Sequence, residues 1–392
     1  MDDQTSSSSR DSFDLDTAAR RFTRSARFNQ EVVEKLQTAL KHNPEVNLLS
    51  VIPSDYKDQL HGISTTTAPR KHKSCVRPPA RRADFCVNLV ERASTATIVH
   101  TLSDTTSLFL AKYLEPEGPF QDPKQCLVMV LKRMISDSEK LWEGQTRGVV
   151  LKCGNDLVAK IIRGNSDYTE YTSLQYLAEH APDIPAPKPH GLIMFGSVQV
   201  MFMTYIPSIT LEQAWCSLTH DNKVSIQQQL DGINCKLRRL KGDGQRLGGV
   251  GGEGVKEDHR FSHHSAEIIT TTAQFEEFRF SVSHGASTPW INFLRSFLPC
   301  PTEDCVFTHG DLRPANIMVK TDSENNYLVS GIIDWEDSGF YPDYFESTRL
   351  LFTFHMHSKE DWCAYLPACI SPARHPVQWL VSRLWEYTIN NS

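Results

Sequence analysis

The sequence predicts an α+β protein in which a small, sheet-rich lobe precedes a larger, mostly helical lobe. Two β-rich runs, 149–153 and 157–162, flank Gly154-Asn155-Asp156, a combination that is typical of a hairpin. A helical stretch and a second hairpin over 192–205 follow. Beyond Pro207 the apolar residues recur mainly at helical spacing, with one further hairpin embedded among them.

The remaining elements are predicted in chain order from periodicity and turn residues. The first helix follows Asp167 and ends before the proline-rich stretch 182–189. Leucine and isoleucine residues over 230–240 form a second helical stripe, which Gly242 is expected to end. The other predicted elements are a helix over 290–298, a hairpin of 316–320 with 327–334, and helices over 344–357 and 377–387.

Changes in composition divide the chain into segments. Residues 1–84 are polar with one short amphipathic stretch, 32–40, so a largely disordered leader is expected. The basic piece 70–82 is compatible with nuclear localisation or an acidic partner, but a solvated linker is favoured. The predicted organisation is a leader over 1–84, an accessory helical segment over 85–136, the sheet-rich lobe over 137–206 and the helical lobe over 207–392.

The composition favours a globular protein over a disordered or nucleic-acid-binding one. Of 392 residues, 40% are hydrophobic, which is enough for a sizeable core, and the formal net charge is −6. The ten cysteines contain no C-x-x-C pair, so reduced thiols are favoured over a zinc finger. Neither a signal-like start nor an apolar span of about 20 residues is seen. We therefore expect a cytoplasmic protein that binds neither membrane nor nucleic acid; the sequence leaves its oligomeric state open.

The most informative segment is 308–317, THGDLRPANI. Asp311 and Asn316 are five residues apart, a predicted strand begins at the asparagine, and Asp334 ends the next predicted strand. Phosphoryl transfer uses one carboxylate to orient and deprotonate a hydroxyl, and further oxygen ligands to hold Mg²⁺. Protein kinases have the same Asp-to-Asn spacing in their catalytic loop. Each residue alone fits a turn or a strand end, but the three together favour a phosphotransfer site.

The motifs HGDLRPANI and IIDWEDSGFYP resemble those of the aminoglycoside phosphotransferase family, whose kinase-like fold is shared with choline kinases. The resemblance extends over about 141–390, with details typical of the fungal-type branch. It implies a bilobal protein-kinase-like fold, ATP between the lobes, Mg²⁺ as cofactor and phosphorylation of a hydroxyl on a small molecule. It also implies that Asp311 is the catalytic base, that Asn316 and Asp334 are the metal ligands, and that His309 supports the catalytic loop.

Residues upstream are compatible with the nucleotide side of such a site. Lys160 lies in VAKI, which resembles the strand that presents a lysine to the phosphates, although a lone strand lysine usually faces solvent. Glu170, ten residues later, either holds this lysine or completes a D-x-x-E helix cap that begins at Asp167. The hinge that the resemblance places against the adenine consists of Thr204, Tyr205 and Ile206, and a buried strand there is compatible with that role.

Three further features have competing interpretations. Arg313 either neutralises charge on the transferred phosphoryl or faces solvent. Glu336 and Asp337 are interpreted as loop residues, one of which could touch a second metal. The run 249–254 satisfies G-x-G-x-x-G, but it follows Lys160 and has no strand before it, so we expect a flexible connection rather than a phosphate loop.

Alternative functions stay open at this level. The degenerate glycine loop over 141–150 permits a non-catalytic ATP-binding scaffold, whereas the complete set of Asp311, Asn316 and Asp334 favours an enzyme. A protein kinase is disfavoured because Trp335-Glu336 follows Asp334 in place of Phe-Gly, and no A-P-E motif occurs. We therefore predict a phosphotransferase that acts on a hydroxylated small molecule.

Overall fold

The computed structural model divides the chain into two compact units, Met1–Ala80 and Arg81–Ser392. The residues that the structure describes are 24–48, 51–53, 56, 84–114, 122–144, 148–164, 167–242, 246–258, 262–281, 286–301, 305–350 and 361–391.

The first unit contains helix α1 (Arg24–His42). The ring of Phe28 stacks on that of Tyr56 at 5.7 Å, and the Tyr56 hydroxyl donates a hydrogen bond to Asn29 (2.8 Å). The amphipathic stretch 32–40 of the predicted leader lies within α1, where an aromatic partner from beyond the helix covers part of the apolar face. Residues 1–23 and 57–83 of the predicted leader lie outside the described residues.

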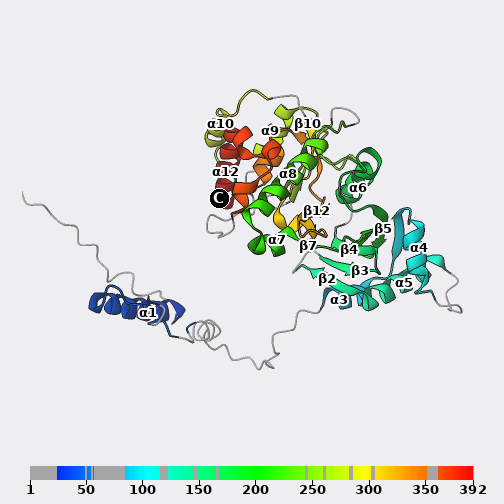
Figure 1. Ribbon diagram of the computed structural model, residues 1–392, viewed down its shortest axis with the longest axis horizontal. Helices are drawn as coiled ribbons and strands as arrows, with labels where there is room; N and C mark the ends of the chain where they lie inside the picture. The colour runs from blue at the N-terminus through cyan, green and yellow to red at the C-terminus, as the bar shows by residue number, and fades with distance from the viewer. Residues whose placement is uncertain are drawn as a thin grey trace, which may run out of the picture. The chain divides into compact units, whose positions relative to one another are not determined.

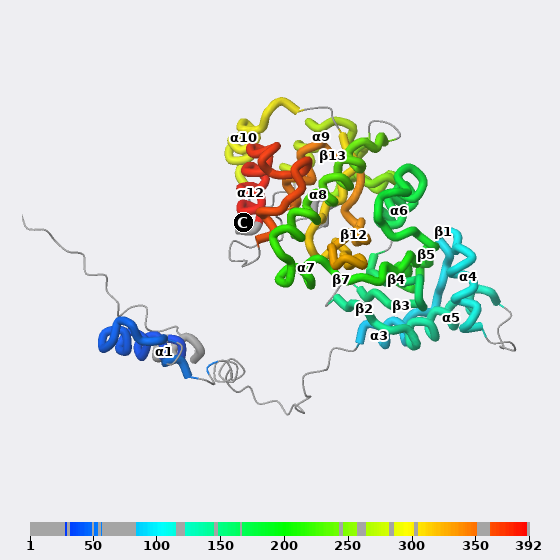
Figure 2. The backbone as a smooth tube through the Cα atoms, in the orientation of Figure 1, coloured from blue at the N-terminus to red at the C-terminus, as the bar shows by residue number. Residues whose placement is uncertain are grey.

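The second unit begins with an antiparallel sheet of six strands in the order β1-β5-β6-β4-β3-β2 (Figures 1 and 2). Both hairpins predicted for the sheet-rich lobe are confirmed, with turns at 154–156 and at 196–197. The strands are β1 (Ala96–His100), β2 (Glu139–Glu143), β3 (Gly148–Lys152), β4 (Leu157–Arg163), β5 (Pro189–Phe195) and β6 (Val198–Thr204).

Strand β4 lies near the middle of this sheet and is buried on both faces. Leu157, Ala159 and Ile161 belong to one apolar cluster, which also contains the helices that cover that face. Val158 packs into a different cluster on the opposite face, and Lys160 shares that side because successive strand residues alternate. The helices of the first face are α3 (Phe85–Arg92), α4 (Asp104–Ala111) and α5 (Pro123–Asp137).

The segment 85–136, which was expected to be accessory and helical, also contains a strand of the sheet. Ala96–His100 forms strand β1, which pairs with β5 through partners such as Ala96 and Phe195. The helices before and after this strand pack on the sheet, as Leu131 and Met134 of α5 are fully buried against it. A sheet whose central strand is apolar on both faces needs such a second layer, so the segment is part of the lobe.

The larger lobe is mostly helical, and its described residues also form three small antiparallel sheets. Strand β10 pairs with β13, β11 lies between β12 and β7, and β8 pairs with β9. Its elements are α7 (Leu211–Ala214), α8 (His220–Leu237), α9 (Thr272–Ser281), α10 (Thr288–Arg295), α11 (Phe345–Arg349), α12 (Pro376–Asn391), and the strands β7 (Ile209–Thr210), β8 (Lys256–Asp258), β9 (Ser262–His264), β10 (Cys305–Thr308), β11 (Ile317–Thr321), β12 (Tyr327–Ile332) and β13 (Gly339–Pro342).

Several predicted helix ends differ from the structure, among them those of α8, α10 and α11; α10 ends at Arg295 rather than at residue 298. Helix α8 ends at Leu237 rather than at Gly242, because Arg239 and Leu240 donate to carbonyls only three residues back and so tighten the last turn. In the predicted helix 344–357, α11 ends at Arg349, and residues 351–357 lie outside the described part.

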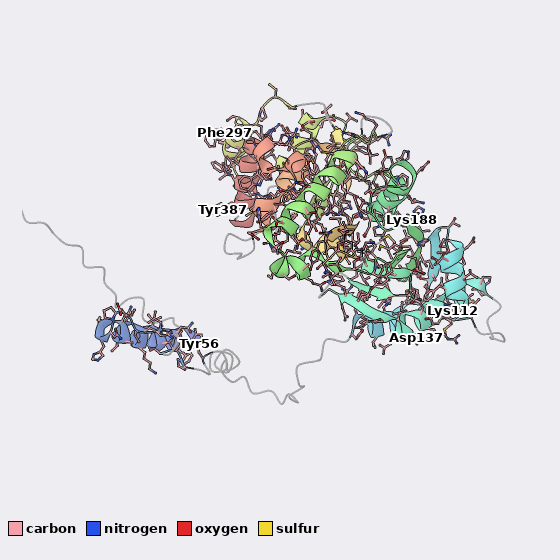
Figure 3. All side chains as sticks on the ribbon, viewed as in Figure 1. Tyr56, Lys112, Asp137, Lys188, Phe297 and Tyr387 are labelled. Carbon is pink, nitrogen blue, oxygen red and sulfur yellow. The ribbon has the colours of Figure 1, made fainter. Side chains whose placement is uncertain are left out.

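The core of the larger lobe is rich in aromatic residues. Trp215, Trp335 and Trp385 are fully buried, whereas Phe297 and Tyr387 lie on the surface, as Figure 3 shows. Among the described residues, no helix has both the length and the apolar content that a membrane span requires.

Candidate active site

The loop between β10 and β11 brings the predicted catalytic residues together. Asn316 donates from Nδ2 to both the Asp311 carboxylate (2.8 Å) and the Asp311 carbonyl (2.9 Å). Arg313 Nε lies 3.0 Å from the same carboxylate, so Arg313 forms an ion pair with Asp311 rather than facing solvent alone. Asp311 is thus held between an amide and a guanidinium, both from its own loop.

The buried ring of His309 fixes the start of this loop. The Asp311 N–H donates to His309 Nδ1 (3.2 Å), so Nδ1 is an acceptor and the proton of a neutral ring lies on Nε2. From there it is donated to the Ile333 carbonyl (3.1 Å). Burial lowers the pKa of His309, which is consistent with a neutral ring. His309 therefore joins the catalytic loop to the chain just before Asp334.

Lys160 lies at the centre of a cluster of carboxylates. Its Nζ is 2.5 Å from Glu170 on α6 (Thr169–His180) and 2.5 Å from Asp334. Glu336 is more distant, at 3.7 Å. The Glu170 side chain thus pairs with Lys160 and does not cap its helix; Asp167 instead accepts a hydrogen bond from the Thr169 N–H (3.1 Å).

The charged groups of this cluster shift one another's pKa values. Burial opposes the charge of Lys160, but Asp334 and Glu170 outweigh it and raise its pKa. Burial also opposes ionisation of Asp334, yet Lys160 holds the Asp334 pKa below its usual value. Burial together with repulsion from Asp334 raises the pKa of Glu336 to about 7, although the charge of Lys160 opposes this shift. Three carboxylates therefore surround one ammonium group.

The backbone places Asp334 beside the catalytic loop. Ile317 and Ile332 are register partners of β11 and β12, so Asn316 and Asp334 flank the same end of this hairpin. The Ile333 N–H donates to the Asn316 carbonyl (2.9 Å), which strengthens that junction. Asp334 adopts a φ of 68°, a left-handed conformation that aspartate tolerates better than most residues.

The predicted hinge follows β6 and lies against the β11–β12 hairpin. Thr204 ends the strand, and the Tyr205 N–H donates to the Asp156 carbonyl (2.9 Å). A Cβ atom at Gly331 would lie 2.3 Å from Ile206 Cδ1, so a side chain at position 331 would require the Ile206 side chain to move. Within the described residues, no hydrogen-bond partner contacts the Ile206 N–H.

The glycine-rich run 249–254 is not a loose connection, which corrects that expectation. Gly248 forms a bridge with Phe340 of β13, and Gly249 bonds to the Gly254 carbonyl (2.9 Å). Thr172 on α6 donates to Glu253 (2.7 Å). The run therefore packs on the helix that carries Glu170, although nothing in its composition distinguishes it from a flexible loop.

Comparison of the sequence with known protein families identifies the family of this chain. The sequence matches the profile described as "Phosphotransferase enzyme family" over residues 152–368, more than half of the chain. The chain belongs to the phosphotransferase enzyme family. Its bilobal α+β fold and its predicted family are thereby confirmed.

Several solved structures are similar to this phosphotransferase at low identity. Aminoglycoside phosphotransferase APH(4)-Ia is 15% identical, with 64% of this chain and 83% of that chain covered and a TM-score of 0.42. Aminoglycoside-3'-phosphotransferase of type VIII is 15% identical, with coverage of 64% and 93% and a TM-score of 0.41. Aminoglycoside phosphotransferase APH(3'')-Id from Streptomyces rimosus is 13% identical, with coverage of 64% and 91% and a TM-score of 0.39. Comparison with curated proteins gives no match.

Two residues that support the phosphotransferase site have no recognisable signal in the sequence. The buried Glu346 carboxylate on α11 accepts hydrogen bonds from the backbone N–H groups of His309 (2.7 Å) and Gly310 (3.2 Å). Arg349, one helical turn later, donates to the Gly310 carbonyl (3.0 Å). Both contact the backbone of the loop that carries Asp311 from 36 or more residues downstream, a separation that local motifs do not encode.

Lys256 is a further supporting residue. Its side chain is 7% exposed, its Nζ lies 2.7 Å from the Asp167 carboxylate, and it also donates to the Glu336 carbonyl. Asp167 lies just before α6, and Glu336 lies two residues after Asp334. Lys256 therefore joins the two segments that carry the carboxylate partners of Lys160.

We expect Lys256→Met to lower the free energy of unfolding of the phosphotransferase by about 2 kcal/mol. The substitution leaves the Asp167 carboxylate and a backbone carbonyl without their buried cation. Urea denaturation followed by circular dichroism measures the effect. The matched control is Lys236→Met, because Lys236 pairs with Asp183 at 2.5 Å on the exposed surface, where the loss of one ion pair changes the stability little. Equal losses in the two variants would contradict this role of Lys256.

Proposed function

We propose that this phosphotransferase is an ATP- and Mg²⁺-dependent enzyme that phosphorylates a hydroxyl group of a small molecule. One observation carries the proposal: Lys160, Glu170 and Asp334 form a cluster at the same end of the β11–β12 hairpin as the Asp311–Asn316 loop. A cation for phosphates, a carboxylate for a hydroxyl and oxygen ligands for a metal are the parts that phosphoryl transfer requires.

Each side chain has a distinct role in this proposal. Asp311 accepts the proton of the attacking hydroxyl, and Asn316 orients it by donating to one of its carboxylate oxygens. Lys160 has three N–H donors, of which Glu170 and Asp334 take two at 2.5 Å, so one can reach a phosphate oxygen. Arg313, beside Asp311, places positive charge where the phosphoryl group is transferred.

The donor set fits a magnesium ion. Asn316 uses its Nδ2 to hold Asp311, which leaves Oδ1 for a metal, and Asp334 uses Oδ1 for Lys160, which leaves Oδ2. Both are hard oxygen ligands, and the surplus of carboxylates over ammonium groups favours a divalent cation. When bound, Mg²⁺ would offset the charge of the nucleotide phosphates. The Ile206 N–H, two residues after the end of β6, is suited to hydrogen bonding with the adenine.

The proposal is tested by turnover of MgATP with a panel of hydroxylated compounds. The panel includes hygromycin B and streptomycin, which are bound in two of the related solved structures, together with neutral sugars and amino alcohols. We expect radiolabelled phosphate to appear on at least one acceptor, in amounts that depend on Mg²⁺. If the wild-type protein modifies no acceptor and hydrolyses no ATP, the proposal fails and a nucleotide-binding scaffold is the better interpretation.

The decrease of kcat at low pH, the acid limb of its pH profile, provides a separate prediction. Burial raises the pKa of Asp311, and the charge of Arg313 counteracts this by lowering it. Because Asp311 must be ionised to accept a proton, kcat should decrease as the pH falls through its pKa. Arg313→Met removes the opposing charge, so the acid limb should move to higher pH. Arg239→Met, at an exposed arginine after α8, is the control and should leave the limb in place. An unchanged or lower limb in Arg313→Met would show that Asp311 is not the titrating base.

A further inference from the structure

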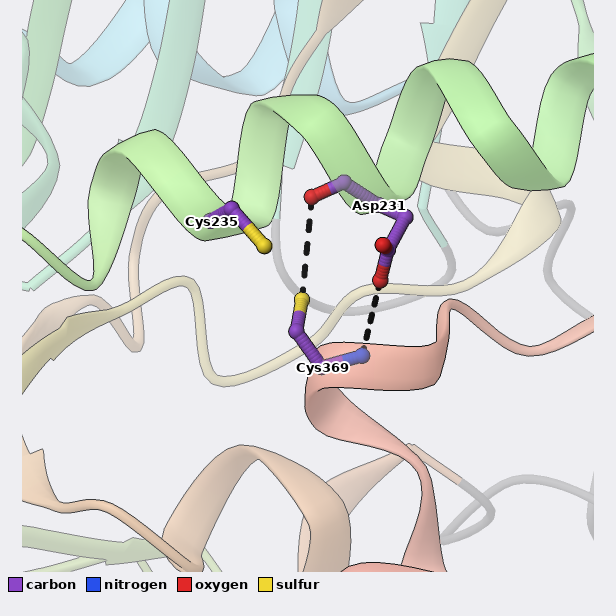
Figure 4. Close-up of side chains that lie close together, drawn as sticks. All are labelled: Asp231, Cys235 and Cys369. Carbon is purple, nitrogen blue, oxygen red and sulfur yellow. Dashed lines mark hydrogen bonds between the residues drawn. The ribbon is translucent and has the colours of Figure 1, made fainter.

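A second group of chemically reactive side chains lies between α8 and the short helix Ala368–Ile370, outside the site described above. Asp231 and Cys235 are four residues apart on α8, so they project from the same face of that helix. Cys369 faces them from the short helix (Figure 4). A carboxylate oxygen and the two thiol sulfurs all lie within 4.8 Å of one another.

Hydrogen bonds to α8 fix the position of the short helix. The Cys369 N–H donates to Asp231 Oδ1 (2.7 Å), and its thiol lies 3.7 Å from the Asp231 carbonyl (Figure 4). Gln227, one turn earlier on α8, donates to the Leu366 carbonyl (2.8 Å). The three donor side chains therefore come from two elements that are held in a defined relative position, as a preformed site requires.

We propose that Asp231, Cys235 and Cys369 bind a zinc-type divalent cation. Two thiolates and a carboxylate are ligands that Zn²⁺ accepts, and thiolates select it over Mg²⁺ and Ca²⁺. Zn–S bonds of about 2.3 Å in a tetrahedron place two sulfurs about 3.7 Å apart, so only small side-chain movements are needed. Asp231 and Cys235 are half-buried, which leaves access for a water molecule as the fourth ligand.

Burial of Cys369 disfavours its thiolate form until a cation binds. Burial, together with the neighbouring Asp231 and Cys235, raises the pKa of Cys369. A thiol of raised pKa is a poor nucleophile and reacts slowly with oxidants. A bound cation favours the thiolate form of both cysteines, because it stabilises the negative charge on the sulfurs while the two thiol protons pass to solvent. Binding should therefore strengthen as the pH rises.

The cation would connect α8 to the short helix Ala368–Ile370, and none of its three proposed ligands belongs to the Lys160 cluster. On the opposite side, α8 supports β12 through Gln229, which donates to the Tyr327 carbonyl (2.9 Å) and accepts from the Val329 N–H (2.9 Å). We therefore expect the cation to stabilise the lobe without taking part in phosphoryl transfer, so the inference does not depend on the proposed activity.

The experiment uses the full-length, reduced and metal-free protein, with Zn²⁺ alone as the ligand and Co²⁺ as a spectroscopic probe. We expect one equivalent of Co²⁺ to give thiolate-to-metal charge-transfer absorbance, and Zn²⁺ to displace it and raise the Tm. Cys235→Ser and Cys369→Ser should each weaken Zn²⁺ binding by about 100-fold, and Asp231→Asn by about 10-fold. Cys363→Ser, at an exposed cysteine in the neighbouring 3₁₀ helix, is the matched control and should bind as the wild type does.

The charge-transfer signal separates this site from the carboxylates around Asp334, which contain no sulfur. The proposal is overturned if the wild-type protein gives no such signal, or if both cysteine variants retain it. It is also overturned if peptide mapping finds Cys235 and Cys369 joined as a disulfide in the protein as purified and Zn²⁺ leaves the Tm unchanged. Asp231→Asn keeps both cysteines, so it remains informative even if a serine variant does not fold.

Discussion

Replacing Asp311 with asparagine is expected to lower kcat for phosphoryl transfer by about 10²- to 10⁴-fold, the usual contribution of a general base. Affinity for MgATP should stay close to that of the wild type. The reason lies in the geometry: asparagine retains an oxygen that can accept from Asn316, so the loop keeps its structure and only the charge and basicity are lost. Initial rates with the best acceptor of the panel, together with nucleotide titrations, measure the two effects.

The control for this variant is Asp183→Asn, which removes a carboxylate from the exposed surface. It should leave kcat unchanged. If Asp311→Asn keeps full activity, Asp311 is not the base, whichever acceptor is used. If kcat and MgATP affinity fall together, the residue contributes to binding rather than to the chemical step.

The catalytic loop could be predicted because its chemistry is local in the sequence. Asp311, Arg313 and Asn316 lie within six residues, and the structure brings them into direct contact. The Lys160–Glu170 pair was one of two interpretations, since the same glutamate also fitted a helix cap. Only the tertiary structure decides between them, because it turns the Glu170 side chain toward β4.

Periodicity gave no information about the direction of Lys160, and the structure explains why. Strand β4 is apolar on both faces, with Leu157, Ala159 and Ile161 packed on one side and Val158 on the other. Alternation of polar and apolar residues is typical of a strand with one solvated face. A strand that is buried on both faces does not show this alternation. The lysine is buried by its ion pairs, which a hydrophobic pattern cannot represent.

Strand β1 and the residues Glu346 and Lys256 could not be predicted from the sequence, for a different reason. Strand β1 has no buried residue after Ala96, so its five residues give a weak strand signal between helical stretches. Glu346 and Lys256 reach the site from distant segments, and each resembles an ordinary surface residue in sequence. Long-range contacts of single charged side chains leave no pattern in a single sequence.

Asp334→Asn is expected to abolish most of the Mg²⁺ dependence of nucleotide binding. In the presence of Mg²⁺ we expect affinity for an ATP analogue to fall by about 100-fold, because a charged metal ligand is lost. In EDTA the substitution should no longer weaken binding. Removing a carboxylate beside the phosphates relieves repulsion, so the affinity of the variant for the ATP analogue should be equal to or higher than that of the wild type. Asparagine is preferred to alanine because it also tolerates the φ of 68° at this position.

The matched control is Asp322→Asn, at the opposite end of the β11–β12 hairpin. Asp322 accepts backbone hydrogen bonds from Glu324 (2.8 Å) and Asn326 (2.9 Å), which asparagine can retain. It should behave as the wild type with and without Mg²⁺. Calorimetric titrations under both conditions give the four affinities required. If Asp334→Asn weakens binding equally in Mg²⁺ and in EDTA, Asp334 acts by positioning Lys160, to which it lies 2.5 Å away, and not as a metal ligand.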